Sequence, residues 1–198
     1  MSRSTLLSLP LVLLALGTAI ATAPAHAQLR VTVEGVNFQP MPIAVPTFDG
    51  GNAQAQELAQ RISEVVRSDL DSTGLFRMIE EQSFIEKDLD IGLAPRFPDW
   101  TVIDVQALVV GNVLIDSNFN MTAQFRVYDV FGSSELLAKQ YSVPTPDNWR
   151  RVAHKVADDI YSQLTGEDGY FDSRIVFVSE SGPPTDRKRR LAIMDQDG

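Results

Sequence analysis

Histidine and cysteine, the side chains that carry most nucleophilic and zinc chemistry, are scarce in this chain. It has no cysteines and two histidines, His26 and His154, and His26 lies in a segment that we expect to be removed. One remaining histidine excludes a zinc site built from several His or Cys ligands. A Ser-His-Asp triad would need His154 and a Gly-x-Ser-x-Gly turn, which Gly132-Ser133 and Ser181-Gly182 do not match. We interpret His154, which has basic neighbours in a predicted helix, as a surface or boundary residue.

Two pairs of neighbouring carboxylates could in principle perform acid–base chemistry. They are Asp69 with Asp71, and Asp158 with Asp159. Residues one or two positions apart on a helix point in different directions, so the members of each pair do not converge on one substrate atom. We therefore interpret all four as parts of solvated helix faces.

Three further motifs suggest binding chemistry but lack an essential part. Gly50-Gly51 has no lysine of the kind that a phosphate-binding loop requires. Residues 195–198 begin like a calcium loop but lack the bidentate glutamate, and we interpret them as a turn. The basic run Arg187–Arg190 is interpreted as a charged turn between two strands that discourages edge pairing. The sequence thus predicts no catalytic residues, no metal site and no cofactor.

The first 27 residues have the three parts of a secretory signal peptide. Arg3 supplies a positive start, residues 6–20 are apolar, and Ala25-His26-Ala27 forms a cleavage site. The alternative is a membrane anchor, but the apolar stretch is short for a bilayer span. We expect a mature chain that begins at Gln28 in a bacterial periplasm, since a secreted chain without cysteines must rely on its hydrophobic core.

The charge balance limits the partners. The chain carries 17 basic and 26 acidic residues, a net charge of −9, without a basic stripe. Such a protein is a poor binder of nucleic acid or of anionic membranes. We expect no nucleic-acid partner, no direct membrane insertion and a monomer.

Hydrophobic periodicity predicts two main helices. The first spans residues 52–72 and ends with Gly74 in the left-handed conformation. The second runs from an Asp147 N-cap to Leu164. A short helix over 100–106 is expected to bury Trp100 and Ile103.

The remaining apolar patterns predict strands, the last three of which form a meander. Pro42 is expected at an edge or at the start of its strand. The order of elements predicts an α/β (α+β) fold, a mixed sheet with two main helices on one side. The predicted strands cover residues 29–34, 41–45, 75–80, 107–115, 119–128 and 136–143.

Two more strand patterns, 174–180 and 190–195, follow the second helix and predict a hairpin. An isolated two-stranded hairpin is marginal in water. We therefore expect a second architecture to begin here and to be cut off at Gly198.

Several segments resemble the TolB family of the Tol-Pal envelope system, and together they cover essentially all of the expected mature chain. The segments are PIAVPTF (42–48), DLDSTGLFRMI (69–79), DVQALVVGNV (104–113), FRVYDV (125–130), WRRVAHKVADDIYSQLTGEDGYFDSRIVFVSESG (149–182) and RRLAIMDQDG (189–198).

The resemblance implies a domain organisation: a signal peptide over 1–27, an α/β domain over 28–168 with about five strands in its sheet, and over 169–198 the truncated start of a six-bladed β-propeller. It also implies a non-catalytic periplasmic adaptor that links TolA of the inner membrane to the outer-membrane lipoprotein Pal. Such an adaptor supports outer-membrane integrity and invagination during division. The propeller would bind Pal. The segment implied to bind the periplasmic C-terminal domain of TolA consists of Gln28, Leu29, Arg30, Val31, Thr32, Val33 and Glu34.

Other functions stay open at this point. The chain could be the remnant of a propeller-associated peptidase, which would require a downstream Gly-x-Ser-x-Gly segment. It could also be a small-ligand or glycan-binding module, which would show a saturable ligand shift in thermal unfolding. The strand-prone segment 28–34 could equally be an ordinary first strand of its own sheet.

Overall fold

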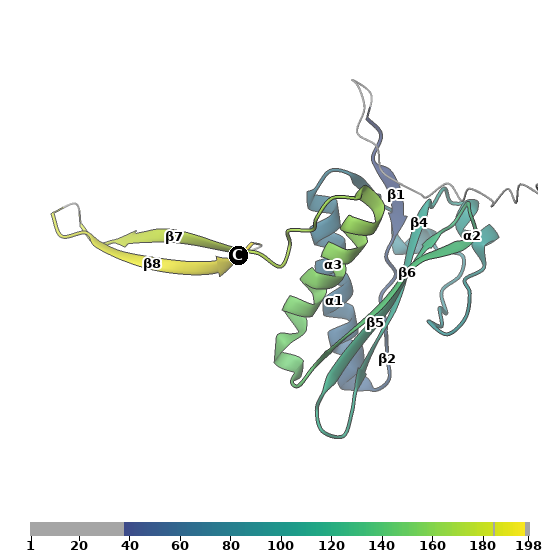
Figure 1. Cartoon of the computed structure of the whole chain (residues 1–198), viewed down its shortest axis with the longest axis horizontal. Coiled ribbons are helices and arrows are strands. Elements are labelled where there is room, and N and C mark those ends of the chain that lie inside the picture. The colour runs from purple at the N-terminus through teal and green to yellow at the C-terminus, as the bar shows by residue number, and fades with distance from the viewer. Residues whose placement is uncertain (1–37, 184, 197–198) are drawn as a thin grey trace, which may run out of the picture.

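A mixed sheet forms the centre of the α/β domain (Figure 1). The computed structural model describes residues 38–183 and 185–196. The sheet order is β3-β1-β4-β5-β6, with a two-residue strand β2 that also pairs with β4. Strands β3, β1 and β4 are parallel, whereas β4, β5 and β6 form the predicted antiparallel meander. The strand bounds are β1 Met41–Ala44, β2 Asp49–Gly50, β3 Phe76–Met78, β4 Ala107–Ile115, β5 Met121–Asp129 and β6 Ser134–Val143.

Two helices, α1 (Ala53–Ser72) and α3 (Trp149–Thr165), lie side by side and cover one face of the sheet (Figure 1). Their apolar stripes are buried, as the sequence predicts. The Asn52 side chain caps α1 by accepting from the Ala55 N–H. Gly74 and Gly166 follow the two helices with φ of 68° and 78°, the left-handed conformation that glycine adopts without strain. The predicted mixed fold with two main helices is confirmed.

The second face of the sheet is covered by the chain between β3 and β4. This chain contains a 3-10 turn (Glu81–Ser83) and the short helix α2 (Phe97–Thr101). Trp100 is fully buried there, and its indole Nε1 donates to Glu86 Oε2 at 2.8 Å. A buried tryptophan needs such a partner for its N–H, so the Glu86 carboxylate is part of this second, smaller core.

Strand β1 ends at Ala44, and Phe48, in the connection between β1 and β2, has its side chain buried in the core. The Phe48 ring lies against Gly111 of β4, where a Cβ atom would come within 2.6 Å of the ring. The Phe48 N–H donates to Ser63 Oγ of α1 at 2.8 Å, so the interrupted backbone still has a partner. Strand β4 is consequently buried on both faces over most of its length, as expected for a central strand.

Of the two positions predicted for Pro42, the structure shows the start of a strand, and β1 is not an edge strand, since it pairs with both β3 and β4. Its missing N–H is tolerated because the ladder with β4 begins one residue later, at Ile43, while the Pro42 carbonyl accepts from the Gln106 N–H. The short helix lies at 97–101 rather than 100–106, because Pro98 favours its first turn, and Ile103 is only partly buried.

The second main helix begins at Trp149, and its N-cap is Asn148 rather than Asp147. Asp147 belongs to a preceding 3-10 turn (Pro146–Asn148), which the Thr145 side chain caps. Phe119 is not part of β5, because it lies in the turn before this strand. The strand predicted over 29–34 lies outside the described residues.

Replacing Ile62 of α1 by alanine should lower the free energy of unfolding by about 2–5 kcal/mol, because its side chain is fully buried between α1 and the sheet. Chemical denaturation measures the change. Gln60→Ala is the control, since Gln60 is exposed on the same helix and should have little effect. Equal midpoints for the two variants would contradict this packing.

Candidate functional site

The predicted TolA-binding segment, Gln28, Leu29, Arg30, Val31, Thr32, Val33 and Glu34, lies outside the described residues. Its role stays a prediction. The described chain starts at Phe38 and enters β1 three residues later, beside the edge strand β3.

His154 is not a surface residue. Its side chain is 4% exposed, and its Nδ1 lies 2.7 Å from Oδ2 of Asp69, which is also buried. A carboxylate can only accept, so the imidazole donates this hydrogen bond, which joins α3 to α1. The helical period gave the signal that the prediction missed: Asp69 follows the buried Val66 by three residues, and His154 precedes the buried Tyr161 by seven.

This buried pair is structural. A general base must come within hydrogen-bonding reach of a substrate atom, and the His154 ring is enclosed. Within residues 38–183 and 185–196, no three His, Asp or Glu side chains lie close enough together to hold a metal ion. His154, which a catalytic triad within this chain would require, is thus buried between α1 and α3.

Asp158 and Asp159 are also not simply solvated. The Asp159 carboxylate accepts from the Tyr141 hydroxyl at 2.6 Å and from Lys139 Nζ at 2.7 Å, so it ties α3 to the edge strand β6. Burial, together with the hydrogen bond to Asp159, raises the pKa of Tyr141. Of the four aspartates, Asp71 alone has the exposed position that the sequence analysis gave it.

The Asp158 carboxylate holds the chain that leaves α3. It accepts the backbone N–H of Phe171 at 2.7 Å and that of Asp172 at 3.1 Å. Gly169 packs so closely on α3 that a Cβ atom there would lie 2.5 Å from the Asp158 Cα. The chain that follows α3 is therefore held by hydrogen bonds to its backbone and by close packing, and not only by charged side chains.

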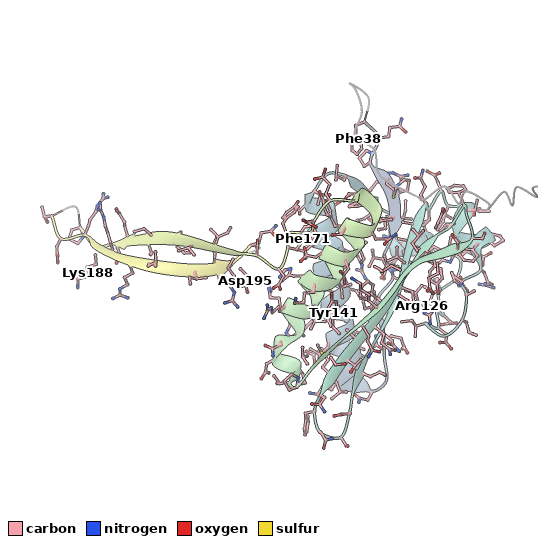
Figure 2. The ribbon with its side chains drawn as sticks, in the orientation of Figure 1. Phe38, Arg126, Tyr141, Phe171, Lys188 and Asp195 are labelled. Atoms are coloured by element: carbon pink, nitrogen blue, oxygen red, sulfur yellow. The ribbon has the colours of Figure 1, made fainter. Side chains whose placement is uncertain are left out.

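Aromatic rings and ion pairs complete this junction, which comprises residues 166–172. Phe171 is buried in the main core, and its ring contacts Tyr161 and Tyr170 at centroid distances of 5.9 and 4.7 Å. Arg151 and Lys155 of α3 both pair with Asp172. Figure 2 shows Phe171 at the point where the chain leaves the domain. The predicted boundary between residues 168 and 169 is not tested by these contacts, but Phe171 packs with the α/β domain.

The two strands that follow, β7 (Arg174–Ser181) and β8 (Lys188–Asp195), form the predicted hairpin and extend away from α3 (Figures 1 and 2). Its apolar side chains are exposed on both faces. One face carries Val176, Val178, Leu191 and Ile193, and the other carries Ile175, Phe177 and Met194.

Glu180 pairs with Arg187 and Arg189 near the turn, so the basic run is partly neutralised within the hairpin. Half of the large hydrophobic side chains that are exposed in the described chain belong to this hairpin. A contiguous exposed apolar surface is usually covered by other protein, a membrane or a ligand. Within the described residues, this hairpin presents such a surface, whereas the enclosed His154 is not accessible to a substrate.

The protein is an α+β domain in which two helices cover one face of a mixed sheet. An exposed β-hairpin follows this domain through the junction at residues 166–172. The chain belongs to the family described as the TolB amino-terminal domain, whose model matches residues 29–136. The resemblance to the TolB family is thereby confirmed. No helix within the described residues is long and apolar enough to span a bilayer.

Two known proteins illustrate the relationship. The Tol-Pal system protein TolB of Paramagnetospirillum magneticum is 43% identical over all 198 residues of this chain, which spans 44% of that relative's length. A crystal structure of TolB from Acinetobacter baumannii superposes with a TM-score of 0.67 at 25% identity, covering 81% of this chain and 37% of that one. The chain therefore spans less than half the length of these two proteins.

Removing either member of the buried pair should destabilise the domain by about 1–3 kcal/mol, since a buried polar group loses its hydrogen-bond partner. Urea unfolding of Asp69→Ala, His154→Ala and the double variant checks this. The double variant should lose less than the sum of the single losses, by about 0.5–3 kcal/mol, because the two side chains interact. Strict additivity would contradict the contact.

Asp158→Ala should speed hydrogen exchange at the amides of Phe171 and Asp172 by about tenfold or more, because each loses a charge-assisted hydrogen bond of about 1.5–3 kcal/mol. Residue-resolved exchange by NMR measures the rates. Asp168→Ala is the matched control, since Asp168 is exposed in the same segment. Unchanged exchange in Asp158→Ala would show that the carboxylate does not hold the junction.

Proposed function

We propose that this protein is a non-catalytic periplasmic adaptor of the Tol-Pal system. It links the TolA complex of the inner membrane to the outer-membrane lipoprotein Pal, and so supports outer-membrane integrity and invagination during cell division. The observation that carries the proposal is the 43% identity to a Tol-Pal system protein TolB over the whole chain. The signal peptide predicted over residues 1–27 would deliver the chain to the periplasm.

The described site is consistent with an adaptor rather than an enzyme. The histidine at 154 is enclosed between two helices and cannot act as a catalytic base, so a peptidase would need a triad outside the described residues. The apolar strands of the hairpin are exposed on both faces and are suited to burial against further protein.

The hairpin β7–β8 supports the second half of the proposal. Strands with apolar side chains on both faces belong inside a stack of sheets, because each face then needs a cover. We infer that this hairpin is the first of a β-propeller that binds Pal. The junction at Asp158 would then fix the direction in which the propeller leaves the α/β domain.

The contact with TolA is proposed for residues 28–34. A strand-prone segment near a free end can add to the edge of a partner's sheet, where main-chain hydrogen bonds supply the affinity. Terminal segments also open at little free-energy cost, which suits a segment that exchanges between its own domain and a partner.

Deleting residues 28–34 should abolish retention of the chain by the immobilised periplasmic C-terminal domain of TolA, because the proposed strand addition is then lost. A pull-down with purified proteins measures this. The control chain carries Asp168→Ala, which leaves the segment intact and should be retained like the wild type. Equal retention of the deleted chain and the wild type would overturn the assigned segment.

A further inference from the structure

Strand β3 is the last strand of the sheet in the described part of the chain, and its outer edge is open there. It pairs with β1 on its inner side. The Leu75 carbonyl and the Ile79 N–H are both hydrogen-bonded to β1. Because backbone groups alternate in direction along a strand, the N–H and C=O groups of Phe76 and Met78 point to the open edge. This edge can therefore accept one more strand.

An open groove of about 550 Å³ lies along this edge. Its lining comes from β3 on one side and from Arg67, Ser68 and Asp71 of α1 on the other. Pro40 also lines the groove, so the beginning of the described chain lies beside it. Figure 2 shows Phe38, the first described residue, near the start of β1. The chain that precedes Phe38 is thus joined to the domain next to an open sheet edge.

The length of the preceding chain suits this edge. Segment 29–34 alternates apolar and polar residues, as a half-buried strand does. A strand beside β3 would lie two strand spacings from β1, about 10 Å away. Residues 35–40 connect the segment to β1 and can span about 20 Å, which leaves length for a turn at Gly35 or Asn37. Beside β6, at the other edge, the distance would be about 19 Å, and the connection would have to be nearly straight.

The charges of the segment match those along β3 in one antiparallel register. The register that places Glu34 opposite Arg77 also places Arg30 opposite Glu81. The Arg77 and Glu81 side chains are 51% and 48% exposed, so a further strand can reach both. Opposite charges directly across a strand pair stabilise it. A shift of two residues in either direction would remove both pairs.

The same register gives the apolar residues of the segment the right face. It places Val33 opposite Met78, whose side chain is partly buried and packs against the main core under α1. Val31 and Leu29 follow on this face, because side chains alternate along a strand. A shift of one residue would turn all three away from α1. Backbone direction, charge and apolar pattern therefore agree on one arrangement.

We propose that residues 29–34 dock as an antiparallel strand on the open edge of β3 in their own domain, with Glu34 opposite Arg77. The contact lies within one chain and does not rest on the proposed function. It gives the strand predicted over 29–34 a partner, and it covers the backbone groups that β3 presents at the edge.

Hydrogen exchange of the chain Gln28–Gly198 tests the docking. Deleting residues 28–34 should speed exchange at the Met78 amide by about tenfold, because this N–H then loses its bond to the segment. The Ile79 amide is the matched control, since it is bonded to the Ile43 carbonyl of β1 and should exchange at an unchanged rate. Equal exchange at Met78 in the two chains would overturn the proposal. Protection of Met78 that grows with protein concentration would also overturn it, because the segment of a second copy would then occupy the edge.

An introduced disulfide tests the register. The chain has no cysteines, so Glu34→Cys with Arg77→Cys gives a single possible bond. Arg77 turns its backbone groups to β1, so the two positions form a non-hydrogen-bonded pair with Cα atoms about 4.5 Å apart, within reach of a disulfide. This pair should oxidise within one chain under mild oxidant.

Val33→Cys with Arg77→Cys is the matched control for the disulfide, because the Val33 side chain points to the other face in this register. This pair should stay largely reduced when the first pair is oxidised. Equal oxidation of the two pairs, or a disulfide that joins two chains on a non-reducing gel, would overturn the arrangement. Both tests use this chain alone, so their failure would leave the proposed function standing.

Discussion

The structure depends on helix α3 being held on two sides at once. Its apolar stripe packs on α1 and the sheet, and the hydrogen bond between His154 and Asp69 fixes one helix against the other inside this contact. Its other side carries Asp158 and Asp159, which hold the exit chain and strand β6. A change in the position of α3 would therefore disturb the core, the edge of the sheet and the direction of the hairpin together.

The periodic elements could be predicted from the sequence, because burial on one face imposes a regular spacing. The helix stripes, the central strand β4 and the glycine that follows α1 are where the pattern placed them. The polar interior could not be predicted in the same way. His154 and Asp69 are 85 residues apart in the chain, so the pattern of neighbouring residues could not predict the hydrogen bond between them. Phe119 was misplaced because it continues the alternation of β5 while the Asp116 turn sets its backbone.

The candidate interaction sites lie at separate places on the domain. The described chain enters at the start of β1, and the hairpin leaves beyond α3 (Figure 1). Such separation suits an adaptor, since two partners can bind one rigid body without sharing a surface. The buried polar pair His154 and Asp69 holds two helices together and is not accessible to a substrate.

A hydrogen-exchange footprint of the chain with and without the periplasmic domain of TolA tests the adaptor account most directly. The account predicts slower exchange in residues 28–34 when the partner is present, with the amides of α1 and α3 unchanged. Exchange that is the same with and without the partner at every position would contradict it.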